Sequence, residues 1–338
     1  MPSPDGRIDL RSDTVTTPTP AMREAMASAP VGDDVFGEDP TINRFQERAA
    51  ASLGMDAGLY VPSGTMANQI ALRTLGRPGT ALLCAEDAHV YRVEGDATGD
   101  SGLVVRAVPD DGGRFGPGDV ERAVAADPVP SLVTIENTYA AGNGRPWRVD
   151  EVRAVGAAAA AHGLAVHCDG ARIWNASIAL GVPAGELVAP ATTAMFCISK
   201  GLSAPVGSVL CGPGDVVAEA RQWRRRLGGA MRQAGVIAAA GLVALDTMIE
   251  RLADDHRRAR HLADALAECF PGSVDPEAIE TNMIFAARDR LPVDFLDRLR
   301  ADGVWALALG DHVRFVTHKD VDDHDLERVV KVLDEMGG

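Results

Sequence analysis

The sequence lacks an excess of positive charge. Among its 338 residues it has 33 Lys and Arg against 48 Asp and Glu, which gives a formal net charge of −15 at pH 7. A protein that neutralises nucleic-acid phosphates needs charge of the opposite sign. The composition therefore excludes nucleic acid as an expected partner and indicates a well-solvated acidic surface.

Long apolar runs are missing as well. No apolar stretch approaches the roughly 20 residues that a membrane-spanning helix needs, and residues 1–5 show no apolar core of a secretory leader. The five cysteines are odd in number, have no metal-ligand spacing, and lie mostly in apolar runs. We therefore expect a cytoplasmic protein with buried, reduced thiols, no membrane partner and no metal site.

The order of apolar runs predicts the fold class. Over the first two thirds of the chain, strand-like runs alternate with helical stretches, which is typical of an α/β protein with a mostly parallel central sheet. Residues 281–338 change character and indicate a small α+β unit. The chain is long enough for two cores, so we predict a large domain with an N-terminal arm over 1–250 and a small C-terminal domain over 251–338.

The most informative stretch runs from residue 164 to residue 200. Two short apolar runs, 164–168 and 194–198, have no helical spacing and indicate buried parallel strands. Asp169 directly follows the first run, and Lys200 follows the second. Because open α/β sheets bind ligands at the carboxyl ends of their strands, we expect both side chains to face one crevice.

An Asp and a Lys in one crevice suit pyridoxal phosphate. The Lys carries this cofactor as a Schiff base, and the Asp keeps the pyridine nitrogen protonated so that the ring withdraws electrons. The alternative, on these residues alone, is a surface Lys after a strand and an Asp that caps the next helix. The rest of the chain has to decide between them.

Residues 59–69 indicate a phosphate site. They read as a short strand, a glycine turn and a helix start. Gly64 allows close approach of the backbone, Thr65 adds a hydroxyl, and the helix dipole favours an anion. The alternative is a simple N-cap by Ser63 or Thr65.

Each of the other candidate site residues has both a functional and a structural interpretation. His89 follows another predicted strand and could stack on a flat ring or cap the next helix, and Glu94 could position water or a proton. Ser12 could supply a hydroxyl to a substrate or belong to an extended arm. The basic run 221–226 could meet a phosphate or form a solvated face.

In this order, the motifs resemble the low-specificity L-threonine aldolases, which are fold-type I pyridoxal-phosphate enzymes of the aromatic amino acid beta-eliminating lyase/threonine aldolase group. The matching segments cover nearly the whole chain: residues 10–16, 31–35, 63–68, 169–172, 199–202, 229–233 and 313–318, together with His89. The resemblance implies a fold-type I large domain, pyridoxal 5'-phosphate as cofactor, and a homotetramer with active sites at subunit interfaces.

The resemblance also implies residue roles. Lys200 would bind the cofactor covalently, Asp169 would pair with the pyridine nitrogen, and His89 would stack on the ring. The phosphate would be held by Gly64, Thr65 and Ser199, and by Arg225 and Arg232 of a neighbouring subunit. Arg172 would lie by the ring oxygen and, with Ser12 and Arg314, would bind the substrate carboxylate.

Two positions depart from the family pattern. Tyr139 stands where the family usually has a His near the β-hydroxyl of the substrate, and Phe36 stands where it usually has a Tyr. Both lie on the substrate side, so they leave the cofactor assignment intact and the natural substrate open. The phenol of Tyr139, with an ordinary pKa near ~10, is a poor base at neutral pH. We therefore favour His89, or a water ordered by Glu94, as the proton acceptor.

The implied activity is retro-aldol cleavage of L-threonine, L-allo-threonine or a related β-hydroxy-α-amino acid to glycine and an aldehyde. Two alternatives stay open. The same cofactor supports β-elimination, racemisation or a transaldol reaction on another β-substituted amino acid. A chain of this fold can also be a non-catalytic amino-acid-binding module, against which the intact Lys200, Asp169 and phosphate segment argue.

Overall fold

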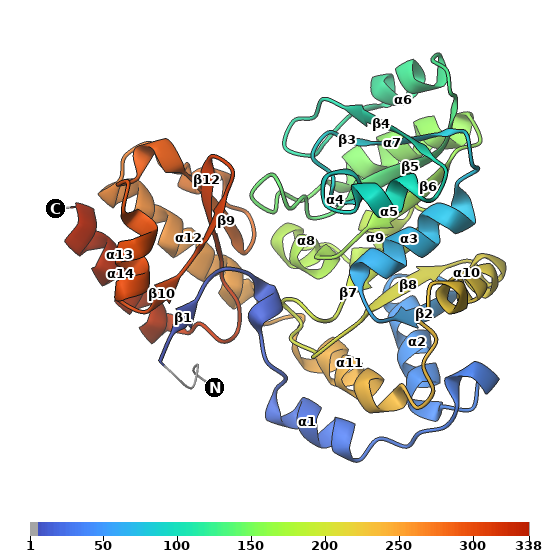
Figure 1. Cartoon of the computed structure of the whole chain (residues 1–338), viewed down its shortest axis with the longest axis horizontal. Helices are drawn as coiled ribbons and strands as arrows, with labels where there is room; N and C mark the ends of the chain where they lie inside the picture. The colour runs from blue at the N-terminus through green and yellow to red at the C-terminus, as the bar shows by residue number, and fades with distance from the viewer. Residues whose placement is uncertain (1–5, 338) are drawn as a thin grey trace.

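The computed structural model describes residues 6–337 of the chain. Residues 1–5, on which the leader prediction rests, lie outside it. The described chain forms a larger lobe around a central sheet and a smaller lobe that contains the C-terminal elements and the first strand (Figure 1).

The central sheet is mostly parallel, as predicted. Within residues 6–337 it has seven strands, in the order β2 (Ala57–Val61), β8 (Ser208–Gly212), β7 (Thr193–Cys197), β6 (Ala165–Asp169), β5 (Pro130–Glu136), β3 (Ala81–Ala85) and β4 (Val104–Val108). Strands β4, β3, β5, β6 and β7 pair in parallel, whereas β8 is antiparallel to both β7 and β2. β3, β5, β7 and β8 are buried along their whole length, which explains their continuous apolar runs.

Helices cover both faces of this sheet. Met195 of β7 belongs to the core beneath α3 (Gly64–Leu75) and α10 (Gly214–Arg226), whereas the next residue, Phe196, belongs to the core beneath α2 (Pro40–Ser52) and α11 (Gly235–Thr247). Successive strand residues point to opposite faces, so one strand contributes to two cores. The remaining helices of this lobe are α1 (Pro20–Ala27), α4 (His89–Arg92), α5 (Gly95–Gly99), α6 (Pro117–Val124), α7 (Val149–Ala161), α8 (Ile173–Leu180) and α9 (Ala184–Val188), with 3-10 turns η1 (Asp13–Val15) and η2 (Asp34–Phe36).

The small lobe has an antiparallel sheet of its own. Its strands are ordered β11 (Leu307–Leu309), β12 (His312–Val316) and β9 (Met283–Ala287), and its helices are α12 (Leu252–Cys269), α13 (Phe295–Ala301) and α14 (Asp323–Gly337), with 3-10 turns η3 (Pro276–Ala278) and η4 (Arg288–Arg290). The N-terminal strand β1 (Ile8–Asp9) pairs in parallel with β10 (Val304–Trp305). Ile8 and Leu10 consequently share a core with residues 259–333.

The connection between the lobes differs from expectation in one detail. The sequence suggests one long helical region up to Cys269, but α11 ends at Thr247 and α12 begins at Leu252. No glycine or proline marks this turn. Met248 and Leu252, which flank the turn between the two helices, both pack into the hydrophobic core of the large lobe. The domain division at residue 250 stays a prediction.

Two further expectations concern membrane-spanning helices and the burial of the thiols. In the part of the chain that the structure describes, no helix has the length and hydrophobicity needed to cross a membrane. Cys84, Cys168, Cys197 and Cys211 are buried free thiols, and Cys269 is half-buried.

Candidate active site

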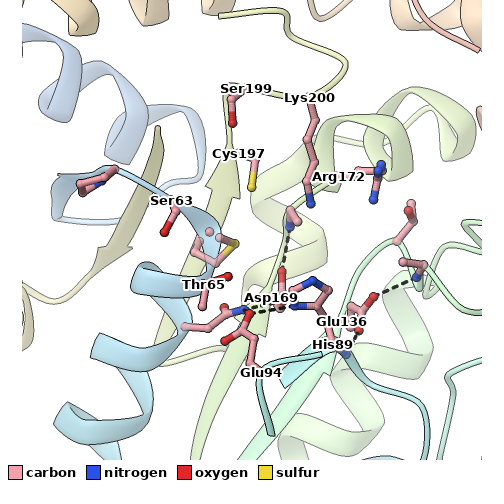
Figure 2. Close-up of a pocket in the computed structure, with 17 residues that line it drawn as sticks. Ser63, Thr65, His89, Glu94, Glu136, Asp169, Arg172, Cys197, Ser199 and Lys200 are labelled. Carbon is pink, nitrogen blue, oxygen red and sulfur yellow. Dashed lines mark hydrogen bonds and ion pairs between the residues drawn. The ribbon is translucent and has the colours of Figure 1, made fainter. Parts of the chain in front are cut away.

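A cavity of about 190 Å³ lies where the carboxyl ends of β5, β6 and β7 meet the first turn of α3. Figure 2 shows Lys200 extending into it towards Asp169, with Ser63 and Thr65 to one side and Arg172 to the other. Of the residues singled out in the sequence, it is lined by Ser63, Gly64, Thr65, His89, Glu94, Asp169, Arg172, Ser199 and Lys200. Chain positions up to 137 residues apart, from 63 to 200, thus meet as the strand-end argument predicts.

The backbone around Lys200 is fixed while its side chain enters the cavity. The Lys200 carbonyl accepts hydrogen bonds from Ser203 N at 2.8 Å and from Thr16 Oγ1 at 3.1 Å. Ile198 N and Ser199 Oγ both donate to Gly207 O, at 3.1 and 3.4 Å. These bonds close the loop between β7 and β8, so the amine is presented from a defined position.

Asp169 is held by two donors on the floor of the cavity. Its Oδ1 accepts from Ala171 N at 3.1 Å, and its Oδ2 accepts from Asn68 Nδ2 at 2.7 Å. The residue is only 3% exposed. The alternative reading, in which Asp169 merely caps a helix, does not fit, because Arg172 occupies the cap position of α8 and makes no side-chain cap bond.

His89 and Glu94 form the next pair. His89 Nδ1 lies 2.8 Å from Glu94 Oε1. Burial lowers the pKa of His89, but the hydrogen bond to Glu94 and the charges of Asp169 and Glu94 outweigh burial and raise the net pKa. The side chain does not cap α4, whose cap position is Ala88. His89 is therefore a hydrogen-bonded imidazole on the cavity wall.

Sequence reasoning missed Glu136 as a site residue. Glu136 is the last residue of β5 and lines the cavity; its Oε2 accepts from His89 N at 2.7 Å and its Oε1 from Ala140 N at 2.9 Å. Burial, and then the charge of Asp169, raise the pKa of Glu136 to about 7. Its position at a strand end is the same signal that identified Asp169. Through these two bonds it fixes the backbone at His89 relative to the loop after β5.

The first turn of α3 has the features of an anion site. Ser63 is the N-cap, and its Oγ accepts from Met66 N at 3.1 Å, so the capping reading holds for Ser63. Gly64 and Thr65 follow in the first turn, where N–H groups have no partner within the helix. A Cβ at Gly64 would lie 3.0 Å from both Cys197 Sγ and Met195 Cε, so glycine lets this turn pack closely on β7.

Arg172 is bound by a residue from the N-terminal segment. Its Nε and Nη2 donate to the two carboxylate oxygens of Asp13 at 2.8 and 2.6 Å. Burial would raise the pKa of Asp13, but the charge and hydrogen bonds of Arg172 lower it to about 2. The neighbouring Ser12 caps η1, with its Oγ accepting from Thr14 N at 3.2 Å, and does not line the cavity.

Arg314 lies close to this pair. Burial and then the charge of Arg172 lower its pKa, and its Nη2 donates to Arg11 O at 2.9 Å. Its Nε is buried without a hydrogen-bond partner among the described residues. Arg314 does not line the cavity itself.

Tyr139 does not lie where the sequence analysis placed it. It is 2% exposed and does not line the cavity; its hydroxyl donates to Asp110 Oδ2 and accepts from Asp87 N, both at 3.0 Å. Its ring packs so closely under Gly113 that a Cβ there would lie 2.0 Å away. Burial, and then the charge of Asp110, raise its pKa. The phenol is therefore a structural group turned away from the cavity, which corrects its expected contact with the substrate.

Phe36, expected on the substrate side, and Arg225 and Arg232, expected to reach a neighbouring subunit, do not line the cavity of their own chain. Phe36 is 73% exposed in η2, Arg225 is exposed on the last turn of α10, and Arg232 forms an ion pair with Asp33 at 3.2 Å. The substrate role of Phe36 and the roles of Arg225 and Arg232 toward a neighbouring subunit stay predictions.

The ligand atoms of His89, Glu94 and Asp169 lie within 4.8 Å of one another, an arrangement that the sequence spacing does not reveal. In this cluster Asn68 Nδ2 donates to both carboxylates, at 2.7 and 3.0 Å. The carboxylates are thus hydrogen-bond acceptors for an amide, and the cluster carries no argument for a metal ion.

A mostly parallel sheet with an amine and a buried carboxylate at the ends of adjacent strands defines the class of fold-type I pyridoxal-phosphate enzymes. The donor set fits that cofactor, with Lys200 for its aldehyde, Asp169 for its ring nitrogen and the first turn of α3 for its phosphate. A solved threonine aldolase from Leishmania major matches the fold with a TM-score of 0.85 and 20% identity, over 98% of this chain and 100% of that one.

The family model described as beta-eliminating lyase matches residues 9–289. A low-specificity L-threonine aldolase from Arabidopsis thaliana is 40% identical, over 94% of this chain and 93% of its own length. One from Escherichia coli K12 is 36% identical, over 95% of this chain and 97% of its own length. The chain belongs to the beta-eliminating lyase family, and its relatives in that family include low-specificity L-threonine aldolases.

Proposed function

We propose that this protein cleaves the Cα–Cβ bond of L-threonine, L-allo-threonine or a related β-hydroxy-α-amino acid, giving glycine and an aldehyde. The observation that carries the proposal is the convergence of Lys200, Asp169 and the His89–Glu94 pair on one cavity. Bound pyridoxal phosphate supplies an electron-withdrawing ring that accepts the electron pair of the broken bond.

The cofactor residues would act from fixed positions. Lys200 would bind the cofactor aldehyde, and its backbone is held by Thr16 and Ser203. Asp169 would hold the proton on the ring nitrogen. Gly64, Thr65 and Ser199 would hold the phosphate, and His89 would stack on the ring.

Arg172 would orient the substrate carboxylate. Asp13 occupies its Nε and Nη2, which leaves Nη1 as the nitrogen without a bond to that carboxylate. Arg314, whose buried Nε has no partner among the described residues, would provide the second cationic group. Ser12 Oγ accepts from Thr14, so its own O–H would stay available to donate to the substrate carboxylate.

His89 would accept the proton of the β-hydroxyl. Its Nδ1 contacts Glu94, so the carboxylate stabilises the imidazolium that results. The hydroxyl of Tyr139 is committed to Asp110 and Asp87 and has no part in this step. Lys200, once displaced by the amino group of the substrate, would return a proton to Cα.

Assembly and location belong to the same proposal. We infer a homotetramer in which Phe36, Arg225 and Arg232 extend towards the site of a neighbouring subunit, and a cytoplasmic location. The exposure of Phe36, Arg225 and Arg226 supports this assembly, whereas Arg224 is buried against Asp34 of its own chain.

Product analysis tests the activity. Protein loaded with pyridoxal phosphate is supplied with L-threonine, L-allo-threonine and L-serine, and glycine, aldehyde, oxo acid and ammonia are measured. We expect glycine and acetaldehyde in equal amounts from one or both threonine isomers, and no product from Lys200→Ala. An oxo acid with ammonia would identify β-elimination, which the family description makes the second candidate. No product from any of the three would count against both activities.

A further inference from the structure

Asn68 lines the cavity and lies at the centre of a buried polar network in its wall. It is 1% exposed, on the second turn of α3. Its Nδ2 donates to Asp169 Oδ2 at 2.7 Å and to Glu94 Oε1 at 3.0 Å, and its Oδ1 lies 3.1 Å from His167 Nε2. One amide group therefore contacts three ionisable side chains, two from β6 and one from the N-cap of α5.

The contacts fix which way this amide points. Both carboxylates need a donor, so the NH₂ group faces them and the oxygen faces His167. His167 must then carry its proton on Nε2, and its Nδ1 accepts from Thr193 Oγ1 at 2.8 Å. Burial lowers the pKa of His167 to about 4, so the ring is neutral at pH 7 and brings no positive charge to Asp169.

Two buried carboxylates consequently share one amide. The ligand oxygens of Asp169 and Glu94 lie within 4.8 Å of each other, and like charges at that distance repel in a buried site. No Lys or Arg among the described residues forms an ion pair with either carboxylate; Glu94 pairs with His89. Asn68 provides the two N–H groups that lie between them.

The two carboxylates depend on Asn68 to different degrees. Glu94 keeps a second amide donor, Gln69 Nε2 at 3.0 Å, and its contact with His89. Asp169 has Ala171 N at 3.1 Å as its other donor. Loss of Asn68 would therefore affect Asp169 more than Glu94.

We propose that Asn68 is a positioning residue that holds the carboxylates of Asp169 and Glu94 next to each other, so that Asp169 retains the cofactor while Glu94 orients His89. This inference rests on the proposed function only in assigning Asp169 to the ring nitrogen of pyridoxal phosphate. It links the residue assigned to the ring nitrogen to the imidazole on the cavity wall through a single side chain.

A double-mutant cycle on cofactor binding tests the proposal. The dissociation constant for pyridoxal phosphate is measured by equilibrium titration of the apoprotein for wild type, Asn68→Ala, Glu94→Gln and the double variant. Removing a donor from a buried charge should weaken binding roughly ten- to hundredfold in Asn68→Ala. In the Glu94→Gln background the same change should weaken binding by about threefold or less, because the repulsion is gone and the new amide can donate to Asp169.

Controls separate this electrostatic role from packing. Asn282→Ala removes another fully buried asparagine, in the small lobe, and should leave the dissociation constant within about twofold of wild type while lowering thermal stability. Asn68→Ser, which keeps a hydroxyl donor, is carried through the same cycle and should lose less affinity than Asn68→Ala. It also serves if the alanine variant does not fold.

Equal losses of affinity in the two backgrounds would overturn the proposal, because a merely space-filling Asn68 cannot depend on the charge at position 94. Unchanged affinity in folded Asn68→Ala would overturn it as well. Product analysis of the wild type is a separate measurement. A protein that binds the cofactor but cleaves no β-hydroxy amino acid would refute the proposed activity and leave the result of the cycle intact.

Discussion

Asp13 holds Arg172 through two parallel hydrogen bonds, at 2.8 and 2.6 Å, across 159 positions of sequence. The pair is almost fully buried, with side-chain exposures of 0% for Asp13 and 7% for Arg172. It connects the N-terminal segment to the N-cap of α8, and it places a guanidinium on the cavity wall.

Removing the carboxylate of Asp13 should damage both stability and substrate binding. Asp13→Ala leaves a buried guanidinium without its partner, which typically costs about 3–5 kcal/mol of unfolding free energy. We also expect a higher KM for the amino acid, since Arg172 is no longer oriented. Urea unfolding and steady-state kinetics measure the two effects. Unchanged stability in Asp13→Ala would contradict the account of this ion pair.

The same pair predicts an acid-sensitive contribution to stability. The pKa of Asp13 is lowered from 3.8 to about 2 in the folded protein, so the carboxylate stabilises the fold above pH 4. That contribution is lost as the pH falls from about 4 towards 2, because the unfolded state takes up the proton first. Asp13→Asn should lose stability at neutral pH but show a shallower decline over this window, measured by unfolding at several pH values.

His256 should make the free energy of unfolding decline with acidification from a higher pH than Asp13 does. Burial, and then the charge of Arg251, lower its pKa to about 4 from 6.5, so the unfolded chain binds a proton that the folded protein excludes. Stability should fall as the pH drops from 6.5 to 4, at no more than ~1.4 kcal/mol per pH unit for one such group. His167 titrates in the same sense. His256→Gln should reduce the slope over this window, and an unchanged slope would contradict the shift.

Tyr139 should matter for stability and little for catalysis. Tyr139→Phe removes the hydroxyl that bonds Asp110 and Asp87 and should cost about 1–2 kcal/mol of unfolding free energy. Cofactor affinity and kcat should stay within about twofold of wild type. A tenfold fall in kcat with unchanged stability would contradict a purely structural role and would show that this phenol acts on the substrate.

Gly64 should be intolerant of even a methyl group. Its Cβ would lie 3.0 Å from Cys197 Sγ and from Met195 Cε, so Gly64→Ala should displace the first turn of α3 and weaken cofactor binding. Replacing Cys197 by Ala removes one of the two contacts, and the double variant should recover part of the lost affinity. Equal affinities of Gly64→Ala and wild type in a cofactor titration would show that the turn adjusts freely.

Sequence patterns alone predict the fold class, the positions of the main strands, and the meeting of Asp169 and Lys200 at one cavity. Apolar runs without helical spacing mark buried strands, and parallel strands bring their carboxyl ends to one edge whatever the side chains in between. A local pattern therefore sufficed to predict that two distant residues line one cavity.

The folded chain was needed to reveal the direction of Tyr139, the partner of Arg172, the position of Asn68 between two carboxylates, and the packing of Ile8 and Leu10 in the small lobe. Each depends on which side chain arrives from a remote element and on whether its polar atoms find a partner there. Hydrophobic periodicity records whether a position is buried. It does not record which polar neighbour a buried side chain meets.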